Sequence, residues 1–286
     1  EGVRSMRENA GHINTSPFTS YNWHGKGNFA SMLDVVVLEA TEVDVNFNAN
    51  SGEFVSVIGP SGAGKTTLLK TVCGLLQPSE GEILINDDSP EQTRSSKNIG
   101  FMTQDPSLMP WLSVIDNVTL PLKLNPVENQ PGLSNAHELI RSVGLVEFQN
   151  HYPHQISSGM KQRVALARAL TINPAVLLMD EPLGALDEIT RSSMQHLLLD
   201  IWEETQKTVL LVTHSIPEAV MMSDRVIVLS PRPGTIIGQV HVNLPRPRQE
   251  SAVHSTHFQE LVSETRRILT SVGTSVVTDY NQNREY

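Results

Sequence analysis

One stretch of the sequence constrains the fold more than any other. It reads Gly-Pro-Ser-Gly-Ala-Gly-Lys-Thr-Thr at Gly59–Thr67 and lies between an apolar run, Phe54–Ile58, and a helical run, Leu68–Val72. This is the spacing G-x-x-x-x-G-K-T in a strand–loop–helix context, which a phosphate-binding loop requires. The glycines let the backbone curl so that successive N–H groups converge on phosphate oxygens, and the helix N-terminus adds partial positive charge. The stretch therefore predicts a nucleoside triphosphate site.

Within this loop, two side chains have distinct expected roles. Lys65 would bridge the β- and γ-phosphates, and the Thr66 hydroxyl would bind Mg²⁺. A glycine-rich turn with a chance lysine is the alternative, but it does not account for the strand and the helix on either side. The residues expected to hold the nucleotide here are Gly59, Pro60, Ser61, Gly62, Ala63, Gly64, Lys65, Thr66 and Thr67.

Two adjacent carboxylates close another strand. Asp180 and Glu181 follow the continuous apolar run Val176–Met179, which is typical of a strand buried on both faces of a sheet. An acidic residue at this place in a phosphate-loop protein holds Mg²⁺, directly or through water. The second carboxylate can orient and deprotonate an attacking water. The alternative is a solvated strand end with two ordinary surface charges.

Composition limits the classes of protein to which this chain can belong. The chain has 286 residues with a formal charge of −10, and this acidic balance argues against nucleic acid as a partner. Cys73 is the only cysteine, which excludes an intrachain disulfide and a cysteine-rich zinc site, and we expect it to be buried. No apolar run approaches the length of a membrane-spanning helix, and no signal-peptide pattern opens the sequence. We expect a soluble protein in a reducing compartment, with at most peripheral membrane contact.

Periodicity predicts an alternation of strands and helices, and so an α/β fold. Strands are expected at Leu33–Leu38, Val43–Phe47, Phe54–Ile58, Glu82–Asn86, Ile99–Met102, Val176–Met179, Val209–Val212 and Val226–Leu229. Helices are expected at Leu68–Val72, Ser113–Leu122, Asn135–Val143, Met160–Leu170, Thr190–Thr205, Ile216–Met222 and Phe258–Leu269.

From about residue 41 to 245, the sequence resembles the ATPase subunits of ABC transporters. Six motifs stand in the family's order: Gly59–Thr67 resembles the Walker A loop, Gln104 the Q-loop glutamine, Ile156–Arg163 the signature, Leu177–Glu181 Walker B, Ala185–Asp187 the D-loop and His214 the switch histidine. The resemblance implies a RecA-like phosphate-loop core with a mainly parallel sheet. It also implies an antiparallel β subdomain on the N-terminal side and an inserted α-helical subdomain at about 105–158. The expected domains are a flexible tail at 1–32, the ATPase domain at 33–245, and a C-terminal extension with one helix at 246–286.

The resemblance also implies a mechanism. Two subunits close head to tail, so that each ATP lies between one subunit's phosphate loop and the other's signature. Glu181 would be the general base, while His214 would contact the γ-phosphate and steady the water. Gln104 would sense Mg²⁺ and water and link the helical subdomain to the core. Together with Thr66 and Asp180, Gln104 completes the expected Mg²⁺ set.

On the signature side, Ser157, Ser158, Gly159 and Asp187 are the expected nucleotide contacts. The three signature residues stand at a helix start, whose N–H groups can meet a γ-phosphate. A plain helix cap by Ser157 and Ser158 is the simpler interpretation, and both can hold.

Narrower cues favour one branch of the family, the nitrate, sulfonate, taurine and bicarbonate importers. They are Pro110-Trp111, Leu183–Asp187, Ser230–Gly234 and Leu244–Arg248. The implied partners are a membrane permease, a second ATPase subunit that is identical or homologous, and indirectly a solute-binding protein. The implied location is the cytoplasmic face of the plasma (inner) membrane. A soluble ABC ATPase without a transport role, or a weakly active regulatory or assembly subunit, is the alternative.

Two departures from the family pattern stand out. Ser158 replaces the first signature glycine and adds a hydroxyl where the backbone passes close to phosphate. The aromatic residue that usually stacks on adenine is missing from the zone at Val35–Val37. Phe29 is the nearest candidate for this contact, ahead of Trp23, Tyr21 and Phe18, and an exposed aromatic with no such role is the alternative.

Overall fold

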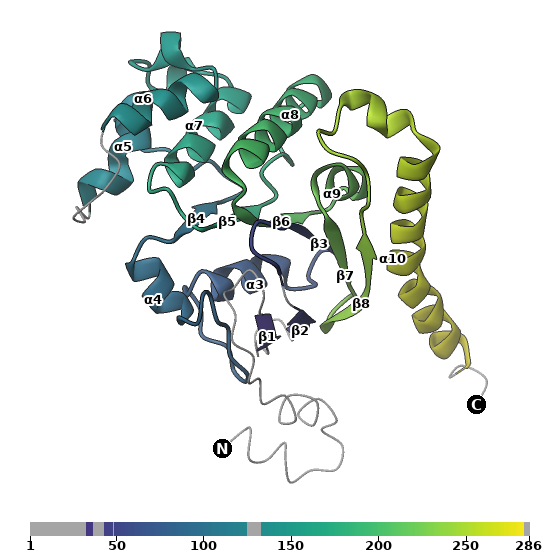
Figure 1. Cartoon of the computed structure of the whole chain (residues 1–286). Coiled ribbons are helices and arrows are strands. Elements are labelled where there is room, and N and C mark those ends of the chain that lie inside the picture. Colours follow the sequence, from purple (N-terminus) through teal and green to yellow (C-terminus); the bar gives the residue numbers. More distant parts are fainter. Residues whose placement is uncertain (1–32, 37–42, 48, 125–132, 283–286) are drawn as a thin grey trace.

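The computed structural model of the chain describes residues 33–36, 43–47, 49–124 and 133–282. The expected N-terminal tail, the adenine candidate Phe29 and the end of the first expected strand lie outside this part of the chain. Within it, eight strands form one sheet in the order β1-β2-β8-β7-β3-β6-β5-β4 (Figure 1). The strands are β1 Leu33–Val36, β2 Val43–Phe47, β3 Phe54–Ile58, β4 Ile99–Met102, β5 Val176–Asp180, β6 Thr208–Thr213, β7 Arg225–Leu229 and β8 Gly234–His241.

The described helices surround this sheet. The α-helices are α3 Lys65–Val72, α4 Pro90–Ser95, α5 Val114–Leu124, α6 Leu133–Ser142, α7 Ser158–Leu170, α8 Glu188–Thr205, α9 Ile216–Met222 and α10 Thr256–Gln282. Three short 3₁₀ helices are η2 Val146–Phe148, η3 Pro153–Gln155 and η4 Glu250–His254.

The centre of the sheet is parallel, and its strand ends are in register. β3 pairs in parallel with β6 and β7, and β5 pairs in parallel with β4 and β6. Ile58 lies opposite Thr213, and Asp180 lies opposite Val212. Because carboxyl ends of parallel strands meet at one edge, the loops after β3, β5 and β6 open on the same side of the molecule.

Antiparallel pairing is confined to one end of the sheet. β8 runs antiparallel to β7, β1 runs antiparallel to β2, and β2 joins β8 in parallel. The antiparallel strands expected on the N-terminal side therefore continue the same sheet.

Side chains alternate between the two faces of the parallel strands, which explains their continuous apolar sequences. Val55 and Val57 of β3 pack with α3 on one face, in one apolar cluster. Phe54 and Ile58 belong to a second cluster on the other face, together with α7, α8, α9 and α10. Helix α10 runs beside β8, while α5, α6 and α7 group together at the opposite end (Figure 1).

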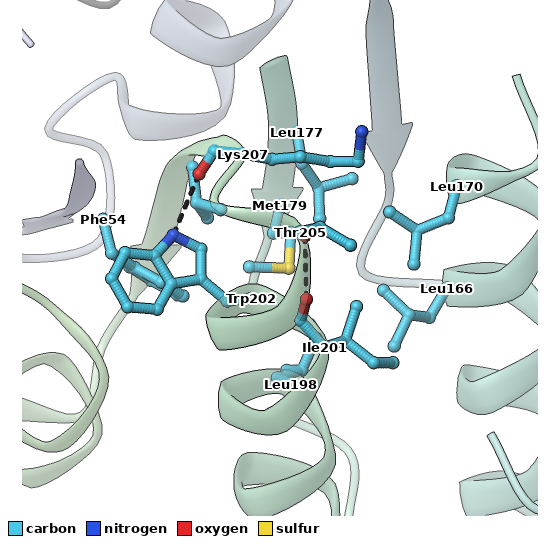
Figure 2. A pocket seen from close by; sticks show the side chains of 11 residues that line it. Phe54, Leu166, Leu170, Leu177, Met179, Leu198, Ile201, Trp202, Thr205 and Lys207 are labelled. Atoms are coloured by element: carbon cyan, nitrogen blue, oxygen red, sulfur yellow. Dashed lines mark hydrogen bonds between the residues drawn. The ribbon is translucent and has the colours of Figure 1, made fainter. Parts of the chain in front are cut away.

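A small apolar cavity lies in the second cluster, between α7, α8 and the sheet (Figure 2). Its volume is about 10 Å³, at the lower limit for one water molecule. The polar side chains at its rim are all bonded: Trp202 Nε1 donates to Lys207 O at 2.9 Å and Thr205 Oγ1 donates to Ile201 O at 2.7 Å. Lys207 Nζ donates to Asn173 Oδ1 and Pro174 O, both at 2.8 Å. The cavity is a packing void without a polar group free to bind a ligand.

Most expected elements form within two or three residues of their predicted limits, and α9 matches fully. The prediction of a strand at Glu82–Asn86 is wrong. Ile85 and Asp88 form an isolated β-bridge instead, because the chain turns at Asn86 and Asp87, which both have positive φ. Sequence patterns missed α4 and β8, and α10 continues beyond the expected Leu269. None of the helices in the described ranges is long and apolar enough to cross a membrane.

Candidate active site

The phosphate loop joins β3 to α3 and leaves the start of that helix open. Gly62 and Gly64 both have a φ of 84°, a left-handed conformation that a side chain disfavours. Gly64 is the N-cap of α3, and no side chain caps the first helical N–H groups. A helix start without a side-chain cap presents N–H donors and partial positive charge to an anion.

The loop itself holds the lysine. Lys65 is only 5% exposed, and its Nζ donates to the carbonyl oxygens of Gly59 at 2.7 Å and Pro60 at 3.0 Å. Burial lowers the pKa of Lys65, while the nearby carboxylates of Glu181 and Asp180 counteract this shift. The ammonium group is thus fixed beside the loop before any phosphate arrives.

Thr66 and Asp180 bring two oxygens together from different elements. Thr66 Oγ1, in the first turn of α3, donates to Asp180 Oδ1 at the end of β5 over 3.1 Å. Burial raises the pKa of the Asp180 carboxyl, and the bond from Thr66 and the cations Lys70 and Lys65 counteract this shift.

Glu181 is held on both carboxylate oxygens. His214 Nε2 lies 2.5 Å from Glu181 Oε1, and Gln104 Nε2 donates to Oε2 at 3.4 Å. His214 Nδ1 lies 3.4 Å from Lys65 Nζ. A hydrogen bond from the Lys65 ammonium requires Nδ1 to accept, and this tautomer carries its proton on Nε2, the nitrogen that faces Glu181. The backbone N–H of Glu181 donates to Val212 O at 2.8 Å, which ties this residue to β6.

Helix α7 holds the segment that contains Gln104. Gln162 Nε2 donates to Gln104 O at 3.0 Å. Arg168 donates to Pro106 O at 2.6 Å and to Ser107 O at 2.9 Å. The loop from Gln104 to Ser107 is therefore fastened to the helix that starts with the signature.

The signature and the D-loop lie apart from this group. Among the described residues, no hydrogen bond or ion pair links Ser157, Ser158, Gly159 or Asp187 to Lys65, Asp180 or Glu181. Ser157 is the N-cap of α7 and accepts from Met160 N at 3.3 Å, while exposed Ser158 is the first helical residue. Asp187 caps α8 and accepts from Thr190 N at 3.0 Å. The site residues expected from sequence thus fall into two sets within one chain.

Two residues near the group formed by Lys65, Asp180 and Glu181 were not expected from the sequence. Glu218 in α9 is 4% exposed, and its Oε1 has no hydrogen-bond partner. Burial raises the pKa of Glu218 to about 7, although a hydrogen bond from Thr213 and the charge of Arg191 lower it. Arg191 of α8 donates to the carbonyl oxygens of Leu183, just before the D-loop, and of Leu186 within it. Ser215-Ile-Pro-Glu218 has the spacing of a capping box, a signal that predicts a helix start but not a buried acid.

Comparison with known proteins agrees with this geometry. A family model described as ABC transporter matches residues 43–184. The taurine import ATP-binding protein TauB of Rhizobium johnstonii is 44% identical over 232 residues, covering 79% of this chain and 88% of that protein. This chain belongs to the ABC transporter family of ATP-binding subunits. The aliphatic sulfonates import ATP-binding protein SsuB of Bacillus anthracis is 43% identical over 249 residues, covering 87% of this chain and 92% of that protein.

Solved structures confirm the phosphate-loop ABC ATPase fold. A dimeric bacterial ABC transporter cassette superimposes with a TM-score of 0.61 and 38% identity, over 71% of this chain and 90% of that one. A dimer of an ATP-binding cassette in a post-hydrolysis state, bound to ADP and Pi, superimposes with a TM-score of 0.60 and 37% identity. As a member of this family, the chain binds ATP and is an ATPase coupled to transport.

Proposed function

We propose that this ABC subunit hydrolyses ATP to power uptake of a small sulfonate, such as taurine or an alkanesulfonate, through a membrane permease. The names of its relatives support the direction of transport and the class of solute. The convergence of Lys65, Asp180 and Glu181 at one edge of the sheet carries the hydrolytic part. The solute would contact the permease and a separate solute-binding protein.

The phosphate loop binds the triphosphate. The backbone N–H groups of Ser61, Gly62, Gly64 and the first turn of α3 would donate to the phosphate oxygens, whereas the Ala63 N–H already donates to Pro60 O at 3.2 Å. Lys65 adds a charge between the β- and γ-phosphates. Because Lys65 already rests on loop carbonyls, little ordering is needed when ATP enters.

The neighbouring oxygens fit Mg²⁺. The Thr66 hydroxyl and the Asp180 carboxylate lie 3.1 Å apart, and Gln104 can contribute its amide oxygen. These are hard oxygen donors of the kind that Mg²⁺ prefers. Bound there, Mg²⁺ would neutralise charge that develops on the β- and γ-phosphate oxygens.

Glu181 acts as the general base. It takes a proton from the attacking water while the water oxygen bonds to the γ-phosphorus and the bond to the bridging oxygen breaks. His214 orients one carboxylate oxygen of Glu181 and contacts the γ-phosphate. Gln104 holds the other oxygen and links the water site to the loop fastened on α7.

The second set of site residues needs a second subunit. We place Ser157, Ser158, Gly159 and Asp187 against the ATP of a partner in a head-to-tail dimer, identical or homologous. The separation of the two sets within one chain supports this arrangement, as do the dimeric cassettes among the structural neighbours. The ATPase domain would span 33–245, with the helical subdomain at 105–158 and an extension at 246–286.

The permease would hold the dimer at the cytoplasmic face of the membrane, against the segment that follows Gln104. Trp111 in this segment is 70% exposed. An exposed tryptophan is a common anchor of protein interfaces. Its exposure in the single chain therefore supports a permease contact.

Reconstitution tests the proposal. The subunit is purified with its permease in proteoliposomes, and ATPase activity and solute uptake are measured with taurine, an alkanesulfonate, nitrate and bicarbonate. We expect the sulfonates to stimulate both, and a complex carrying Lys65→Ala to show neither. Stimulation by nitrate or bicarbonate alone would contradict the solute class, and absence of any ATPase would contradict the hydrolytic role.

A further inference from the structure

The turn between β7 and β8 lies directly against the phosphate loop. A Cβ placed on Gly234 would lie 2.1 Å from the carbonyl oxygen of Ala63, far inside contact distance. A Cβ on Gly59, at the other end of the loop, would lie 3.1 Å from Leu229 Cβ and 3.2 Å from Leu229 O. The end of β7 and the start of β8 thus support the loop at two points.

This support is internally braced. Ser230 Oγ lies 2.7 Å from Pro233 O and accepts from Thr235 N at 2.9 Å, which closes the turn on itself. Ser230 N donates to Thr235 O at 2.8 Å. Gly234 also pairs with Val43 of β2, so β8 is held between two strands. Moving Gly234 away from the loop would disturb all of these contacts.

The contact fixes the direction of one peptide group. In a planar trans peptide the C=O and the following N–H point in opposite directions. The Ala63 oxygen faces Gly234, so the Gly64 N–H faces away from β8. Gly64 is the N-cap of α3, and within the described residues its N–H donates no hydrogen bond.

We propose that Gly234 is a positioning residue for the nucleotide site: it holds the Ala63–Gly64 peptide so that the Gly64 N–H faces the phosphates. This inference rests on the proposed binding of ATP at the loop. Any side chain at residue 234 must displace either the Ala63 carbonyl or the start of β8. Because β8 is braced by Ser230 and two strands, the loop gives way first.

The main test is Gly234→Ala, with Kd for ATP measured by titration calorimetry and folding followed by circular dichroism and Tm. We expect Kd to rise about tenfold or more, the loss of roughly one hydrogen bond to a charged group. Competition by inorganic tripolyphosphate, which shares only the phosphates with ATP, should weaken by a similar factor. A purely structural role would lower Tm without this phosphate-specific loss.

Gly238→Ala is the matched control in the same strand. A Cβ there would meet Ile268 Cγ2, a side-chain methyl group on α10 rather than the phosphate loop, at 2.8 Å, so we expect lower stability with Kd unchanged. Ser230→Ala loosens the brace without a clash, and it should raise Kd several-fold in a folded protein.

A folded Gly234→Ala protein with wild-type Kd overturns the inference. If that variant does not fold, Ser230→Ala decides, and wild-type Kd in that variant also overturns it. Failure of the proposed function would look different, because the wild type would then bind no ATP and Lys65→Ala would change nothing.

Discussion

Glu181 receives a contact on each carboxylate oxygen, from His214 on one and Gln104 on the other. Such a clamp fixes the direction of the lone pairs, which a base must aim at its water. Glutamine has the same shape but cannot take a proton.

We therefore expect Glu181→Gln to keep ATP binding while kcat falls about 10²- to 10⁴-fold, the usual contribution of a general base. The variant should also accumulate a closed dimer with ATP. Steady-state ATPase assays and size-exclusion chromatography measure the two effects, with Lys65→Ala as the binding-deficient control. Turnover at the wild-type rate would remove Glu181 from the role of base.

Glu218 makes stability depend on pH in an unusual direction. Its pKa is raised from 4.5 to about 7, so the folded state keeps a proton that the unfolded state has lost. Below pH 4.5 the carboxyl is neutral in both states and burial costs little. Between the unfolded pKa of 4.5 and the folded pKa of about 7, the free energy of unfolding falls as pH rises, by up to about 3 kcal/mol. Above the folded pKa, the full cost of burying the charged carboxylate lowers the stability. Arg191 and Glu181 are the charged groups that act on it.

Glu218→Gln should remove this pH dependence. The Tm of the variant relative to the wild type should rise steadily between pH 5 and pH 8, measured by calorimetry without nucleotide. Exposed Glu264→Gln is the control and should show no such trend. A difference in Tm that stays constant with pH would mean that Glu218 titrates normally.

Helix α9 links the switch residue to the C-terminal segment. It begins two residues after His214, and its last carbonyl groups are capped by a side chain from beyond β8. Arg248 Nη1 donates to Val220 O, Met221 O and Ser223 O at 3.2, 3.0 and 2.7 Å. Burial lowers the pKa of Arg248 to about 10, so it stays charged at neutral pH and complements the negative end of the helix.

Arg248→Ala leaves several carbonyl groups without a partner. We expect it to lower the free energy of unfolding by about 3 kcal/mol or more, as for a broken buried network. Because α9 begins beside His214, we expect kcat for ATP hydrolysis to fall together with the free energy of unfolding. Urea titration and ATPase assays measure both, and exposed Arg266→Ala is the control. If the free energy of unfolding of Arg248→Ala matched that of Arg266→Ala, the cap by Arg248 would not stabilise the fold.

At the scale of helices and strands, the sequence predicts some elements far better than others. The parallel strands and α9 follow from continuous apolar runs and cap signals that are local. Strand β8 was missed because Gly234 and Gly238 weaken its pattern, and both glycines are explained only by distant neighbours, Ala63 and Ile268. In the site, Lys65, Asp180 and Glu181 are predictable because Lys65 begins a helix, Asp180 ends a strand and Glu181 follows it directly. The burial of Glu218 and the cap by Arg248 depend on contacts between distant segments, which no local pattern encodes.

At the scale of the whole molecule, the main feature is that the site residues in the described part of the chain fall into two separate sets. Trp111 is 70% exposed in the single chain, and in the proposed complex it lies against the permease.

We expect Trp111→Ala to reduce assembly with the permease and solute uptake at least several-fold, while the basal ATPase of the isolated subunit stays unchanged. Co-purification and uptake in proteoliposomes measure this, with Leu75→Ala, another exposed apolar residue, as the control. An equal loss of basal ATPase would instead make Trp111 a folding residue.

The bonds from Gln162 and Arg168 to the loop at Gln104–Ser107 join that loop and α7 into one rigid unit. In the proposed dimer, the loop end of this unit contacts the permease, and the start of α7 contacts the ATP bound by the opposite subunit. A movement of the permease against the loop would then displace the start of α7 at that ATP. Control of the two ATP molecules would be crossed, with each half of the permease timing hydrolysis in the subunit that it does not contact.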